Sequence, residues 1–96
     1  NALADDILMA RARLFINQKD YARAVISLKK IADEHPTELW GDDAIFILGD
    51  IYDNNLNDKA QAKIYYQKII TDHPGSLWIN EARKRFRVLR GDATGA

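Results

Sequence analysis

The chain has 96 residues, enough for one domain that hides about 60 to 65% of the surface its unfolded form exposes. Its 14 basic and 14 acidic side chains cancel, so the net charge indicates neither a nucleic-acid nor a membrane partner. The lack of cysteine excludes disulfides and thiolate chemistry, and no apolar run is long enough for a membrane span.

Apolar residues recur at helical spacing along the chain, and short segments rich in Asn, Pro or Gly interrupt them. The pattern predicts an all-α fold without strands. Gly91 is expected to end the last helix, and residues 91–96 are predicted to form a flexible tail. The expected helices lie near residues 3–17, 20–34, 38–54, 58–72 and 76–90.

An internal repeat is the strongest signal. An offset of 38 residues pairs residues 20–44 with 58–82, and 11 of the 25 positions are identical, where composition alone would give about one or two. When the same offset is extended to the first helix, it predicts that the first and third helices each turn a matching row of residues toward the core. These rows pair Ile7, Ala10, Arg11 and Leu14 with Ile45, Leu48, Gly49 and Tyr52.

The first helix is apolar nearly all round, which is typical of a helix that is buried on two sides. We expect the chain to be the C-terminal end of a longer array whose preceding repeat is absent. The alternative is a homo-oligomer that self-associates through this helix. The apolar residues concerned are Leu3, Ile7, Leu8, Met9, Leu14, Phe15 and Ile16.

The repeated residues resemble the tetratricopeptide repeat family. The second copy contains Ile45-x2-Leu48-Gly49-x2-Tyr52, then Ala62-x3-Tyr66 and Pro74. The first copy is more divergent, because Arg11 occupies the place of the small Gly. The long linker, with His-Pro-x-x-Leu-Trp followed by an acidic residue and Ala, is similar to repeats of bacterial cell-envelope proteins, such as outer-membrane assembly lipoproteins and Tol-Pal accessory proteins.

The resemblance implies an α-solenoid of two helical hairpins plus a C-terminal capping helix, wound as a right-handed superhelix. It places the first repeat at about residues 3–37, the second at about 38–75 and the capping helix at 76–90, in one domain spanning 3–90. It also implies a protein or peptide partner on a concave face lined by the first helices, and a bacterial envelope location rather than the cytoplasm.

Candidate residues for that face lie one helical side away from the predicted core rows. If exposed, they would form two apolar strips edged by carboxylates, suited to an amphipathic or basic peptide. The alternative is that Leu8 and Phe15 pack on a neighbouring element. The candidates are Asp5, Leu8, Ala12 and Phe15 on the first helix and Asp43, Phe46, Asp50 and Asp53 on the third.

The last helix is basic, with five cations against a single Glu81. We interpret it as a solvated capping helix whose cations complement its own dipole, and expect no nucleic acid to bind. The alternative is a secondary docking patch for nucleic acid or an acidic partner, formed by Arg83, Lys84 and Arg87.

Catalytic and metal-binding patterns are missing from the sequence. It contains no Gly-rich phosphate loop, His-Glu-x-x-His motif or nucleophile elbow. His35 and His73 recur one repeat apart, too far to share a metal, and are predicted to be structural. Trp40 and Trp78 are expected to fill the gap between helix pairs. We therefore predict a non-enzymatic protein without cofactor or metal.

Overall fold

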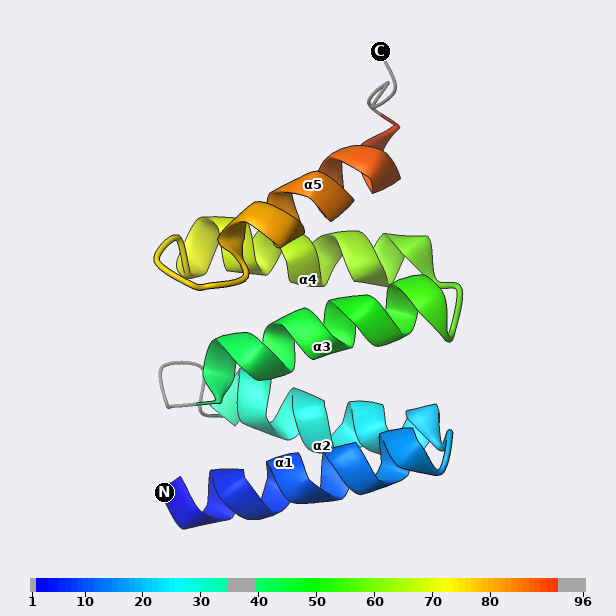
Figure 1. Cartoon of the computed structure of the whole chain (residues 1–96), viewed down its shortest axis with the longest axis vertical. Helices are drawn as coiled ribbons and strands as arrows, with labels where there is room; N and C mark the ends of the chain where they lie inside the picture. The colour runs from blue at the N-terminus through cyan, green and yellow to red at the C-terminus, as the bar shows by residue number, and fades with distance from the viewer. Residues whose placement is uncertain (1, 35–39, 92–96) are drawn as a thin grey trace.

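The computed structural model describes residues 2–34 and 40–91, which form helices stacked in chain order (Figure 1). Each helix packs chiefly on its neighbours in the sequence. The described residues contain no strand, so the predicted all-α helical repeat fold is confirmed, and none of their helices is long and apolar enough to cross a membrane. The helices are α1 (Ala2–Asn17), α2 (Tyr21–Glu34), α3 (Gly41–Asn54), α4 (Lys59–Asp72) and α5 (Ile79–Arg90).

The second helix of each hairpin starts in the same way. The carboxylates of Asp20 and Asp58 each accept a hydrogen bond from the backbone N–H three residues later, at 3.2 and 3.1 Å. Such caps satisfy an N–H group that has no partner within the helix. The preceding residues, Lys19 and Asn57, have φ values of 60° and 53°, so each chain reversal passes through the left-handed region.

The third and fifth helices begin three residues later than the sequence pattern predicts. At α5 the reason is Ser76, whose hydroxyl accepts a hydrogen bond from the backbone N–H of Trp78 at 3.1 Å and donates one to Asp42 at 2.5 Å. Residues 76–78 therefore form a turn that is attached to α3. α5 ends as expected at Gly91, which has a φ of 91°.

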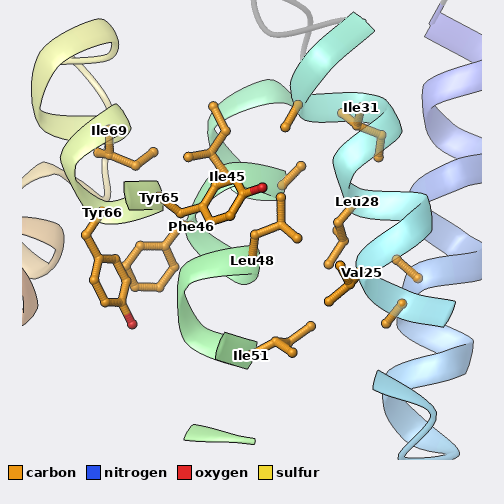
Figure 2. Close-up of a cluster of buried hydrophobic side chains, with 14 of the residues drawn as sticks. Val25, Leu28, Ile31, Ile45, Phe46, Leu48, Ile51, Tyr65, Tyr66 and Ile69 are labelled. Atoms are coloured by element: carbon orange, nitrogen blue, oxygen red, sulfur yellow. The ribbon is translucent and has the colours of Figure 1, made fainter. Parts of the chain in front are cut away.

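The hydrophobic core lies on both sides of α3 (Figure 2). Leu48 points toward Val25 and Leu28 of α2. On the α4 side, the ring centroids of Phe46 and Tyr66 are 5.8 Å apart. Since α3 has apolar residues on two sides, it needs two neighbouring helices to cover them. A single hairpin cannot bury its own surface, and the hairpins stabilise one another.

Gly49 allows α3 and α4 to approach closely. A Cβ atom at this position would lie 2.6 Å from Cε1 of Tyr66, nearer than real Cβ atoms come to other atoms. Tyr66 has no exposed surface, and its hydroxyl donates a hydrogen bond to Asp53, so the ring is held in place. A side chain at Gly49 would therefore require the ring of Tyr66 to shift.

We predict that Gly49→Ala lowers the free energy of unfolding by about 1–3 kcal/mol, because the methyl group overpacks the contact with Tyr66. The loss should appear although Ala gains about 1 kcal/mol of helix propensity over Gly. Urea unfolding followed by circular dichroism measures it. Gly75→Ala is the control: no atom lies within 4 Å of its new Cβ, so its stability should change by less than about 0.5 kcal/mol. An unfolding midpoint for Gly49→Ala equal to the wild type would contradict the close approach.

Candidate functional site

The first helix is related to the third by an offset of 37 residues, whereas the second helices are related by 38. Three residues separate α1 from α2, but four separate α3 from α4. Ala12, which is fully buried, is therefore in register with Gly49, and Arg11, expected at that place, is exposed. Because successive helical residues are about 100° apart, the one-residue difference turns every predicted position of α1 by that angle.

The binding residues predicted on α1 lie toward the interior. Asp5 is 1% exposed and Ala12 is 0% exposed, while Leu8 and Phe15 are half-buried and pack against the core. The expectation that these four residues form an exposed surface is wrong, and the reason is the shorter turn after α1. The alternative, that Leu8 and Phe15 pack on a neighbouring element, is confirmed.

In the corrected register, Asp6 and Arg13 of α1 match Asp43 and Asp50 of α3. All four side chains are exposed or half-buried. On α5, Arg85 reaches the same side of α3, because it forms an ion pair with Asp50 at 2.8 Å. We call the surface formed by these five residues the odd-helix face.

Two tryptophans link successive odd-numbered helices on this face. Trp40, just before α3, donates an indole hydrogen bond to Asp6 at 2.6 Å, and Trp78, just before α5, donates one to Asp43 at 2.7 Å. The guanidinium of Arg13 lies 5.6 Å from the centroid of the Trp40 ring, within cation–π distance. Both tryptophans pack against the core, as expected from their place beside the linkers. The repeated spacing of 34 and 35 residues between Asp and Trp could have indicated this contact from the sequence.

Phe46, predicted to be an exposed groove residue, is only 5% exposed. The ring of Trp78 stacks on it, with centroids 4.2 Å apart and planes inclined by 7°. The guanidinium of Arg85 lies 4.9 Å from the centroid of the Phe46 ring. The expected apolar strip on α3 is therefore wrong, because residues at the start of α5 and within it cover Phe46.

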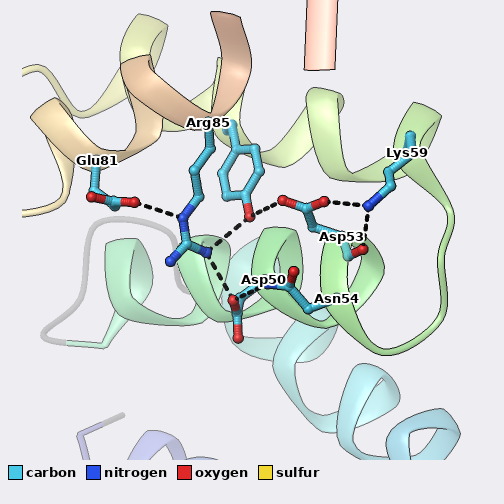
Figure 3. A network of polar contacts seen from close by, with 7 residues as sticks. Asp50, Asp53, Asn54, Lys59, Glu81 and Arg85 are labelled. Carbon is cyan, nitrogen blue, oxygen red and sulfur yellow. Dashed lines mark hydrogen bonds and ion pairs between the residues drawn. The ribbon is translucent and has the colours of Figure 1, made fainter. Parts of the chain in front are cut away.

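Arg85 joins α5 to α3 and α4 through a polar network (Figure 3). Its Nη1 donates to Asp50 at 2.8 Å and to the hydroxyl of Tyr66 at 3.1 Å, and its Nε donates to Glu81 at 2.8 Å. The Tyr66 hydroxyl donates in turn to Asp53 at 3.1 Å. The structure thus brings the predicted residues Asp50 and Asp53 into one network, in which both carboxylates already have partners within the chain.

The network shifts the pKa values of Tyr66, Glu81 and Arg85. Burial raises the pKa of the Tyr66 hydroxyl above its ordinary value of 10.0, the hydrogen bond from Arg85 opposes the rise, and the Asp53 charge adds to it. The hydrogen bond from Arg85 lowers the pKa of Glu81. Burial alone would lower the pKa of Arg85, but its hydrogen bonds with Tyr66, Glu81 and Asp50 outweigh burial and raise it. At neutral pH Tyr66 is therefore a neutral donor between two charged groups.

The predicted basic patch of Arg83, Lys84 and Arg87 is exposed on α5. With an offset of 38 residues, these positions match Ile45, Phe46 and Gly49, which are buried in α3. Charged side chains at these positions suit a helix side that faces water. The two remaining arginines of α5 have contacts within the chain: Arg85 in the network, and Arg90 above the ring of Phe86 at 5.4 Å.

No group of three His, Cys, Asp or Glu side chains in residues 2–34 and 40–91 could hold a metal ion. His73 follows α4, and its backbone N–H donates to the carbonyl of Ile69 at 2.9 Å. His35 lies outside the described residues.

The stacked hairpins and the contacts repeated between them define an α-helical repeat protein. The family model of the tetratricopeptide repeat matches residues 6–37 and 43–76, and the chain belongs to this family. The two matches begin 37 residues apart, at Asp6 and Asp43, in agreement with the register of α1 and α3. A search of curated proteins and a search of solved structures return no match. Tetratricopeptide repeats generally mediate protein–protein interaction and are typically non-enzymatic scaffolds.

We predict that Tyr66→Phe lowers the free energy of unfolding at neutral pH by about 0.5–1.5 kcal/mol, because two hydrogen bonds are lost. The raised pKa of Tyr66 also means that the unfolded chain releases this proton first, so the wild type loses stability as the pH rises above 10.0. The variant should lose less over the same range. Urea unfolding at about pH 9 and about pH 11 measures both effects. Tyr21→Phe, at the half-buried start of α2, is the control for the loss of a tyrosine hydroxyl outside the network. If the free energy of unfolding falls equally for Tyr66→Phe and the wild type between these two pH values, Tyr66 is not the group whose titration lowers the stability.

Proposed function

We propose that the chain is a protein-interaction module, a non-enzymatic scaffold or adaptor segment that binds a peptide or partner helix on the odd-helix face. The observation that carries the proposal is the fixed position of the side chains on this face. Trp40 and Trp78 hold Asp6 and Asp43, and Arg85 holds Asp50. Side chains that are ordered before binding lose less conformational entropy when a partner docks.

The chemistry of the face favours a basic or amphipathic peptide. Asp50 of this face and Glu81, which is bound to Arg85 of the face, each keep 42% of their side-chain surface exposed, whereas the neighbouring Asp53 keeps 14% and pairs with Lys59 at 2.7 Å. The two more exposed carboxylates remain accessible to a second cation or N–H donor, since a carboxylate accepts several hydrogen bonds. On α1 the proposed site contains Asp6 and Arg13. The four α1 residues predicted from the sequence are left out because they lie toward the interior. The likeness to cell-envelope scaffolds stays a prediction.

We predict that Asp50→Lys weakens peptide binding about tenfold or more, because it repels both Arg85 and basic residues of the ligand. Peptides selected from a random display library on the immobilised chain provide the ligands. Titration into the isotope-labelled chain, followed by NMR, should shift amide signals of the odd-helix face.

Asp72→Lys is the matched control, because it makes the same change of charge on an exposed residue of α4 and should leave binding unchanged. The proposal fails if enriched peptides shift signals elsewhere, or if both lysine variants lose binding equally and so report only the net charge.

The basic patch generates a separate prediction. We expect no retention of the chain on immobilised DNA even at low salt, because three exposed cations on one helix turn give few phosphate contacts and the whole chain is neutral. Elution over a salt series measures this. Retention that is lost in an Arg83→Glu, Arg87→Glu variant would instead establish the patch as a nucleic-acid site.

A further inference from the structure

A stripe of aliphatic side chains is exposed on the outer side of α1. Leu3, Ile7 and Leu14 are 67%, 47% and 53% exposed. Their spacing of four and seven residues places them on one side of the helix, with the exposed Ala10 and Arg11 between Ile7 and Leu14. We call these five residues the α1 outer face. Contiguous apolar surface of this kind marks an interaction site more often than isolated exposed residues do.

The register of the repeats shows what kind of element fits this face. On α3 the residues that match Ile7, Arg11 and Leu14 are buried, and Leu48 and Ile51 point toward Leu28 and Val25 of α2 (Figure 2). The α1 outer face therefore repeats a surface that α2 covers on α3, but no helix among the described residues covers it on α1. The matching pairs, 37 residues apart, are Ile7 and Ala44, Ala10 and Ile47, Arg11 and Leu48, and Leu14 and Ile51.

A hollow of about 370 Å³ between α1 and α2 extends the face at one edge. Ala4, Ile7 and Leu8 line it from α1, and Lys30 and Glu34 line it from α2. The residues of α3 that match the three α1 residues are all buried. The hollow is thus part of the same incomplete interface. The matching α3 residues are Gly41, Ala44 and Ile45.

Arg11 makes the α1 outer face differ from its counterpart. It stands where α3 has Leu48, opposite Leu28 of α2. An apolar side chain opposite Arg11 would remove water from the guanidinium without replacing its hydrogen bonds, which is unfavourable. A carboxylate at the position of Leu28 would form a charge-assisted hydrogen bond instead.

We propose that the α1 outer face binds an amphipathic helix of a partner protein, with an aliphatic stripe like that of α2 and an acidic residue opposite Arg11. This surface is separate from the odd-helix face, because Asp6 and Arg13 lie on a different side of α1. The interaction combines apolar burial by Ile7 and Leu14 with one ion pair that sets the register of the bound helix.

The probe is a helix-stapled peptide with the sequence of residues 21–34, made in its native form and with Leu28→Glu. Each form is titrated into the isotope-labelled full chain and followed by NMR. The Leu28→Glu peptide should shift amide signals of α1 and bind at least about fivefold more tightly than the native peptide. The Arg11→Leu chain should reverse this preference, because its face then matches that of α3.

Two variants of the chain complete the test. Ile7→Asp should abolish binding, and Ile26→Asp, which makes the same change at a more exposed aliphatic residue on α2, should not; circular dichroism verifies that both are folded. An unchanged preference in the Arg11→Leu chain, or shifts confined to the odd-helix face, would overturn the proposal. It is also overturned if sedimentation shows a dimer that Ile7→Asp dissociates, since the occupant is then a second copy.

Discussion

Burial of α3 between α2 and α4 is the constraint on which the rest of the structure depends. Leu48 and Ile51 are covered by α2, while Gly49 lets the ring of Tyr66 lie directly against the helix on the other side. A buried Leu or Ile side chain contributes about 1.5–3 kcal/mol, so the middle helix carries much of the stability. The close approach of α4 also brings the Tyr66 hydroxyl to Asp53 and so positions the polar network.

The sequence allowed the fold to be predicted because the repeat signal is redundant. Helical spacing, the identical pairs and the break residues all indicate the same hairpins, and the capping aspartates Asp20 and Asp58 lie at equivalent places. The exposure of α1 was predicted wrongly for one reason. The offset of 38 was measured on the second helices, and a turn that is one residue shorter rotates α1 by about 100°. The sequence contains one sign of this error. An offset of 38 puts Arg11 at the position of Gly49, whereas an offset of 37 puts the small Ala12 there, which suits a close helix contact.

The candidate site could be predicted only in part. The carboxylates of α3 were found because they recur on one side of a single helix. Their partners could not be found in the same way, because Arg85 lies 35 residues after Asp50, and Trp78 lies 32 residues after the Phe46 that it covers. Such pairs depend on the angle at which one hairpin packs on the next and on side-chain rotamers, and spacing along one helix does not determine either.

The contacts between odd-numbered helices have a consequence for dynamics. The hydrogen bonds that Trp40 donates to Asp6, Trp78 to Asp43 and Arg85 to Asp50 each span 34 or 35 residues, so each joins only adjacent repeats. α1 and α5 therefore communicate through α3. Opening free energies should fall from the middle of the stack toward both ends, and amide hydrogen exchange should be slowest in α3. A ligand that binds one end of the stack would raise the opening free energy of the adjoining repeat and so slow its amide hydrogen exchange. Binding at one end would in this way stabilise residues that the ligand does not contact.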